Sequence, residues 1–190
     1  MQCKQIQQCG LTLLELLVYL SIATLVLVIG VPFLRETLLQ QRATAQMQQL
    51  VLAINTARSE AMTRADVITL CRSRDFLSCN GTWSDGYILF IDEKANGQVS
   101  HEAMILRVFQ PLHASDKLSW SAFGSNNYLQ MSPNGFTRSQ NGTFYYCPAN
   151  GDAHYARAVI VDQTGRARVS QDQDGDGIHE NAKGDPLRCD

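Results

Sequence analysis

The first third of the chain holds two contrasting patterns of hydrophobic and polar positions. An apolar run covers residues 11–34 and contains one charged residue, Glu15. At about 1.5 Å per residue, a helix of this length crosses a bilayer. Beyond it the pattern becomes amphipathic, with apolar residues at spacings of three and four, namely Met47, Leu50, Val51, Ile54, Ala57 and Ala61. We therefore expect one helix over about 12–64, with its first half in lipid, its second half packed on a domain, and a bend at Pro32.

From residue 67 onward, short runs of β-branched and aromatic residues alternate with turn residues, which predicts strands. These lie at 67–71, 87–92, 103–109, 118–123, 127–131, 143–147, 156–162 and 166–170. The last two flank "DQTG", a predicted hairpin turn with Gly165 in a left-handed conformation. The predicted fold class is α+β, with a long N-terminal helix packed on an antiparallel β-sheet domain. That domain covers 67–171, and an irregular acidic tail covers 172–190.

Composition narrows the function classes. The 190 residues carry a formal net charge of −2, so any nucleic-acid site must be a local basic patch. The histidines are scattered without ligand spacing, and no glycine-rich phosphate loop exists, so we expect no enzyme activity. Trp83 and Trp120 are expected in the core rather than on a stacking surface.

Four of the six cysteines follow the apolar run. In an exported domain an even number predicts two disulfides, and four cysteines allow three pairings. We favour Cys71–Cys79, which closes a short loop, and Cys147–Cys189, which clamps the C-terminal tail. Free buried thiols are the alternative. Metal binding is disfavoured because the sequence has no C-x-x-C pair.

The N-terminus differs from an ordinary secretory signal, in which an apolar core precedes the cleavage site. Here a polar leader, residues 1–10, comes before the apolar run. "G-LTLLELLV" resembles the type IV prepilin signature, a short leader ending in glycine followed by an apolar helix with glutamate at its fifth position. The resemblance implies that a prepilin peptidase cleaves between Gly10 and Leu11 and that Leu11 is N-methylated. Leucine replaces the usual phenylalanine at this first mature position.

This resemblance also gives Glu15 a partner. A lone charge in hydrocarbon costs roughly 2.5–3.5 kcal/mol on insertion scales and is usually paired. In a pilus, the free amine of Leu11 on one subunit would pair with Glu15 of a neighbour, so the charge is compensated only on assembly. Pro32 falls where pilins carry their helix-bending proline. Residues 11–34 would then form the transmembrane and filament-core helix, and 35–66 its amphipathic half.

The middle and the end of the chain resemble a narrower family. "ARSEAMTRADVITLC" at 57–71, followed by Cys79, Trp83 and "GYILFID", resembles the GspH/FimT family of minor pilins and pseudopilins. "GRAR" at 165–168 resembles the G-R-x-R element of the FimT branch. For that branch the resemblance implies non-specific binding of double-stranded DNA by a type IV pilus during natural transformation. The protein would sit in the bacterial inner membrane before assembly, and then in an extracellular or periplasmic pilus with other pilins.

The residues themselves fit this expectation. Arg166 and Arg168 are two apart on a predicted strand and so share a face, while Ala167 and Val169 point inward. Guanidinium groups bind phosphate oxygens bidentately, and a few such contacts give sequence-independent, salt-sensitive binding. The candidate DNA-binding residues are Gly165, Arg166, Arg168 and Arg157, with Arg138 and Lys183 as candidate extensions. A solvated strand face is the alternative.

The acidic tail offers a rival site. "DQDGDGIHE" at 172–180 resembles a calcium loop, with candidate ligands Asp172, Asp174, Asp176 and Glu180. Position twelve of such a loop would be Lys183 instead of glutamate, and a solvated acidic turn is the alternative. Calcium is the one candidate cofactor. The alternative functions are therefore a structural minor pseudopilin of type II secretion and a calcium-dependent pilus adhesin.

Overall fold

A computed structural model describes residues 12–113 and 115–189. The predicted leader, the cleavage site between Gly10 and Leu11 and the methylation of Leu11 lie outside the described residues. Helix α1 spans Leu13–Arg64 without interruption and includes Pro32, so the predicted extent of the helix is confirmed. The bend at Pro32 stays a prediction. Thr12 caps the helix, because its hydroxyl accepts a hydrogen bond from the Glu15 amide at 3.2 Å.

The chain divides into two compact units, Met1–Leu39 and Gln40–Asp190. In the first unit, the described part of α1 is exposed except at Leu39, and it is apolar enough to cross a membrane by length and composition. The second unit contains every buried residue of the described chain, from Ala43 to Leu187. It therefore has a complete hydrophobic core of its own. The division after Leu39 follows contacts, whereas the sequence boundary at 34/35 marks the end of the apolar run.

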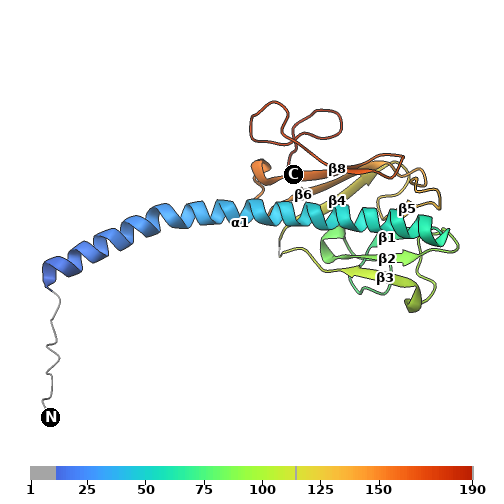
Figure 1. Cartoon of the computed structure of the whole chain (residues 1–190), viewed down its shortest axis with the longest axis horizontal. Helices are drawn as coiled ribbons and strands as arrows, with labels where there is room; N and C mark the ends of the chain where they lie inside the picture. The colour runs from blue at the N-terminus through green and yellow to red at the C-terminus, as the bar shows by residue number, and fades with distance from the viewer. Residues whose placement is uncertain (1–11, 114, 190) are drawn as a thin grey trace, which may run out of the picture. The chain divides into compact units, whose positions relative to one another are not determined.

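In the second unit, α1 presents a buried stripe to two antiparallel sheets of four strands each (Figure 1). The stripe consists of Ala43, Met47, Leu50, Ala53, Ile54, Ala57 and Ala61. Four of these seven residues are alanines, so much of the stripe is formed by small side chains. The predicted apolar face is confirmed, with Ala43 and Ala53 added and Val51 only partly buried.

The first sheet has the order β3-β2-β1-β5 and the second β4-β6-β7-β8. The strands are β1 (Ile68–Arg72), β2 (Tyr87–Ile91), β3 (Ile105–Phe109), β4 (Lys117–Ala122), β5 (Tyr128–Met131), β6 (Gly142–Cys147), β7 (Arg157–Val161) and β8 (Ala167–Val169). Short 3₁₀ helices η1 (Trp83–Asp85), η2 (Glu102–Met104) and η3 (Ala153–Tyr155) lie between them. All eight predicted strands are present, and the α+β fold class is confirmed.

Aromatic rings belong to the same core cluster as the buried stripe of α1. Trp120 stacks on Phe144 with ring centroids 4.2 Å apart, and Trp83 meets Phe144 edge-on at 4.9 Å. Both tryptophans are only 4% exposed. The expectation that they belong to the core is therefore confirmed.

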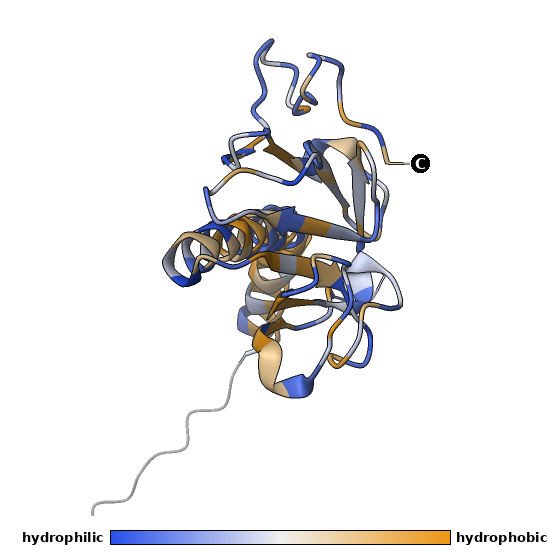
Figure 2. Ribbon diagram, turned by 90° about the vertical axis from the view of Figure 1, so that its right-hand side faces the viewer, coloured by the Kyte–Doolittle hydropathy of each residue, from blue (hydrophilic) through white to orange (hydrophobic). Residues whose placement is uncertain are grey.

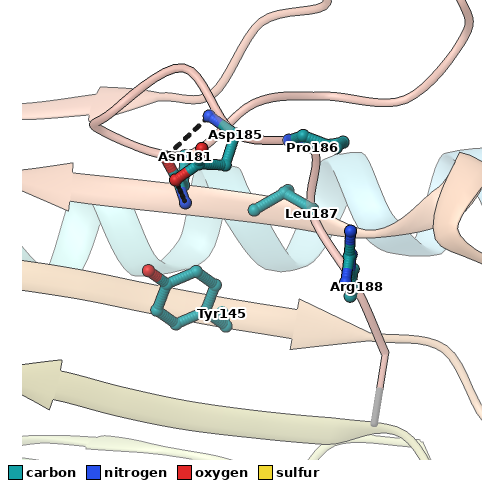
Figure 3. A pocket seen from close by; sticks show the side chains of 6 residues that line it. All are labelled: Tyr145, Asn181, Asp185, Pro186, Leu187 and Arg188. Carbon is teal, nitrogen blue, oxygen red and sulfur yellow. Dashed lines mark hydrogen bonds between the residues drawn. The ribbon is translucent and has the colours of Figure 1, made fainter.

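Both predicted disulfides, Cys71–Cys79 and Cys147–Cys189, are present. Cys147–Cys189 holds the tail on the outer face of the second sheet, where Leu187 packs with Ala156 and Ala158. Figure 3 shows Pro186, Leu187 and Arg188 beside Tyr145 of β6. The tail loops after β8 are mainly hydrophilic (Figure 2).

Candidate nucleic-acid interface

The hairpin between β7 and β8 is closed by a tight turn at residues 162–165. Gly165 donates its amide hydrogen to the Asp162 carbonyl at 3.0 Å, and Asp162 donates to the Arg166 carbonyl at 3.1 Å. Gly165 has φ of +74°, as predicted for a left-handed turn residue. The Asp162 carboxylate accepts hydrogen bonds from the Thr164 hydroxyl at 2.6 Å and the Arg166 amide at 3.1 Å. These bonds, led by that of Thr164, hold the pKa of Asp162 below its ordinary value, so the carboxylate is ionised at neutral pH.

Two exposed arginines, Arg166 and Arg168, follow this turn directly. We call the segment 162–168 the arginine turn. Arg168 pairs with Ile160 across the strands, whereas Ala167 pairs with Val161 and Val169 with Val159. This register agrees with the predicted alternation of faces. Val169 nevertheless stays 36% exposed, because β8 is the edge strand and no further strand covers it.

A loop at residues 132–138 supports the turn from the side. Gly165 contacts the carbonyl oxygen of Gly135 so closely that a Cβ at Gly165 would overlap it. The Nε of Arg58, on α1, donates to the same oxygen at 3.1 Å. Thr137 donates its amide hydrogen to the Gln163 carbonyl at 3.0 Å. Sequence reasoning missed Arg58 and this loop, because no local pattern links residues so far apart.

Of the two candidate extensions, the structure brings only Arg138 to the turn. Arg138 is exposed and directly follows Thr137, which is bonded to the turn. Its amide donates to the Gln130 carbonyl at 3.1 Å, which ties this segment to β5. Lys183 lies instead in a separate turn of the tail, where its amide donates to the Asn181 side chain.

Arg157 does not join the exposed arginines. It stands at the opposite end of β7 from the turn and pairs with Tyr146, on the inner side of the sheet. Its guanidinium donates to the carbonyls of His154 at 2.8 Å and Ala156 at 2.7 Å. Burial lowers the pKa of Arg157. Arg157 is odd-numbered, like Val159 and Val161, whereas Arg166 and Arg168 are in register with the even-numbered residues of β7, so the expected grouping of Arg157 with the turn arginines is wrong.

The four acidic residues of the tail come together as the sequence predicted. One carboxylate oxygen from each of Asp172, Asp174, Asp176 and Glu180 lies within 4.8 Å of the others. Asp172 also accepts amide hydrogens from Gly175 at 2.7 Å and Gly177 at 2.9 Å, which lower its pKa. Such a set of oxygens suits a hard cation such as Ca²⁺.

Comparisons with known proteins bear on both the fold and the family. A family model described as "Type II transport protein GspH" matches residues 46–165. A crystal structure of the type IV minor pilin FimU from Pseudomonas aeruginosa strain PAO1 is 23% identical, with a TM-score of 0.53. That alignment covers 83% of this chain and 99% of the FimU chain. A second crystal form of FimU gives 22% identity and a TM-score of 0.50, over 67% and 92% of the two chains. The search of curated proteins found no match.

Proposed function

This chain belongs to the GspH family, and from that premise we propose that it is a minor pilin of a type IV pilus that binds DNA during natural transformation. The observation that carries the proposal is the pair of exposed arginines, Arg166 and Arg168, that directly follow the braced turn at 162–165, with Arg138 on the adjoining loop. The fold that the chain shares with FimU supports the pilin part. Double-stranded DNA is the proposed ligand.

The electrostatics of the turn favour a weak, general phosphate site. The turn contributes one carboxylate, that of Asp162, against the positive charges of Arg166, Arg168 and Arg138. The hydrogen bonds of this carboxylate are made within the turn itself. Guanidinium groups bind phosphate oxygens in pairs of parallel hydrogen bonds. Two or three such contacts carry no base information, so binding is expected to be independent of sequence and sensitive to salt.

Replacing both turn arginines tests the DNA proposal. Arg166→Gln/Arg168→Gln removes two phosphate contacts from exposed positions, so the variant should fold normally and bind a blunt DNA duplex about tenfold more weakly at low salt. The measurement is fluorescence anisotropy with the full chain in a neutral detergent. The matched control is Arg107→Gln, an exposed arginine on β3 in the other sheet. Equal affinity in the wild type and the double variant contradicts the proposal.

Two alternatives are separated by the same assay. The description of the matched family favours a structural pseudopilin of type II secretion, for which no DNA binding is expected. The four clustered carboxylates favour Ca²⁺ as an additional ligand of the tail. Each titration is therefore run with calcium and with EDTA. Binding that persists in EDTA agrees with the arginine turn as the DNA site, whereas binding that needs calcium favours the calcium-dependent adhesin.

As a pilin, the chain would have other pilins, a prepilin peptidase and the inner membrane as partners. Glu15 lies in the first turn of α1, four residues after the proposed new N-terminus at Leu11 in the sequence. If the amine of a neighbouring subunit compensates this carboxylate, Glu15→Val should leave the protein in the membrane but strongly reduce its amount in sheared pili. Glu36→Val, which removes another exposed carboxylate of α1, is the control. Full incorporation of the Glu15→Val variant into pili would contradict the pairing of Glu15 with a neighbouring amine.

A further inference from the structure

Two exposed phenylalanine rings lie at the same end of the second unit as the arginine turn. Phe136 is 46% exposed and Phe123 is 77% exposed. Ala122, Gly142, Val161 and Ala167 stand in one row across the second sheet. Phe123 follows the first of these residues, and its amide donates to the Asn141 carbonyl at 3.3 Å. The turn at 162–165 joins the last two, so the ring of Phe123 and the turn belong to one end of the sheet.

Phe136 stands closest to the turn. The residue before it, Gly135, contacts Gly165, and the residue after it, Thr137, is bonded to Gln163. Thr137 is buried, while Phe136 and Arg138 on either side of it are exposed. In an extended segment, residues two apart share a face, so the ring and the Arg138 guanidinium emerge together beside the turn that carries Arg166.

An aromatic ring among arginines has a specific use toward nucleic acids. Cations follow the phosphate backbone of either a duplex or a single strand, because both present phosphates. A ring can stack on a base only when that base is not already stacked inside a duplex, and this mode is typical of proteins that bind single strands. Stacking tolerates any base, which suits a site without sequence preference.

We propose that Phe136, together with Arg138 and Arg166, binds single-stranded DNA, including the single-stranded ends of a duplex, by stacking on an unpaired base. This inference rests on the proposed function, since it requires that the turn arginines bind DNA phosphates. It goes beyond that function by naming a second element of recognition and the form of DNA that it selects. The Asp162 carboxylate lies on the same turn, and its negative charge opposes phosphate binding there.

The test compares an oligothymidine with a blunt duplex of equal length, at one salt concentration and with the full chain in a neutral detergent. Phe136→Ala should weaken single-strand binding about tenfold and change duplex binding less than about twofold. The matched control is Leu77→Ala. Leu77 is 52% exposed in the loop that the Cys71–Cys79 disulfide closes, at the Arg72 end of β1. The opposite end of β1, at Ile68, pairs with Met131 beside the loop at 132–138, so replacing Leu77 should change neither affinity.

A second variant reads stacking directly. The two native tryptophans, Trp83 and Trp120, are both 4% exposed. The indole introduced by Phe136→Trp would therefore be the variant's single exposed tryptophan side chain. Its fluorescence should be quenched by the oligothymidine and much less by the blunt duplex. Quenching by both DNA forms alike, or by neither, would overturn the proposal.

The outcomes separate this proposal from the one on which it rests. If the arginine variant loses duplex binding while Phe136→Ala leaves both affinities unchanged, the DNA function stands and the stacking proposal fails. If Phe136→Ala weakens both forms equally, the ring only supports the turn, and the proposal also fails. If Phe136→Ala instead lowers incorporation into pili and leaves DNA binding unchanged, the ring is a contact between subunits. Absence of binding to either DNA form overturns both proposals.

Discussion

Gly165→Ala is expected to destabilise the domain by about 3 kcal/mol and to weaken DNA binding about tenfold, although both turn arginines remain. Gly165 has φ of +74°, where alanine costs roughly 1–2 kcal/mol. The added Cβ would also overlap the carbonyl oxygen of Gly135. That oxygen is held by Arg58 at 3.1 Å and belongs to the backbone, so it cannot swing aside. The turn must shift, and the arginines shift with it.

Gly151→Ala is the matched control for this substitution. Gly151 has φ of +69°, close to that of Gly165, but nothing lies within 4 Å of a Cβ built there. It should therefore show the backbone strain alone, roughly 1–2 kcal/mol, and normal DNA binding. Thermal unfolding followed by near-ultraviolet circular dichroism reports on the buried tryptophans of the domain. Equal losses of stability in the two variants would contradict the contact between Gly165 and Gly135.

Asp92→Ala is expected to lower the free energy of unfolding by about 3 kcal/mol, a loss of roughly 10 °C in Tm. Asp92 is buried on the outer face of the first sheet. Its carboxylate accepts hydrogen bonds from the Thr69 hydroxyl at 2.8 Å, the Gln130 amide group at 2.9 Å and the Gly97 amide at 2.8 Å. Alanine would leave these buried donors without their acceptor, and a buried donor without a partner costs its full desolvation penalty.

The neighbouring carboxylate supplies the control for Asp92. Glu93 is exposed, so Glu93→Ala should change stability by no more than about 0.5 kcal/mol. The same thermal unfolding experiment, with the full chain in detergent, compares the two variants. If Asp92→Ala unfolds within a degree or two of the Glu93 variant, the hydrogen bonds of Asp92 contribute little and the account of the outer face is wrong.

Local patterns were enough to predict the secondary structure. The apolar spacing of Met47, Leu50 and Ile54 marks one helix face, and runs of β-branched residues in segments such as 157–161 mark strands. The even cysteine count and the spacing of the cysteines led to the two disulfides. The division into two sheets was not predicted, because β5 returns to the first sheet after β4 has joined the second. Nothing in the composition of β4 or β5 indicates which of the two sheets each strand joins.

The candidate site was predictable only in part, for the same reason. The turn with Gly165, Arg166 and Arg168 is local, and the sequence located it correctly. The contact of Gly135 with Gly165 and the hydrogen bond from Arg58 join segments far apart in the chain. Nearness in sequence groups Arg157 with the turn, but this residue lies at the other end of β7. Tertiary contacts decide which arginines share a surface.

The salt dependence of duplex binding tests the central claim most directly. The logarithm of the binding constant falls linearly with the logarithm of salt concentration, with a slope of about −0.9 per phosphate contact. The measurement compares the wild type with Arg166→Gln/Arg168→Gln over a series of salt concentrations. If the turn arginines bind phosphates, the wild-type slope should be steeper than that of the variant by about two contacts. Identical slopes and affinities for the two proteins would contradict the account, because the arginines would then be no more than a solvated strand face.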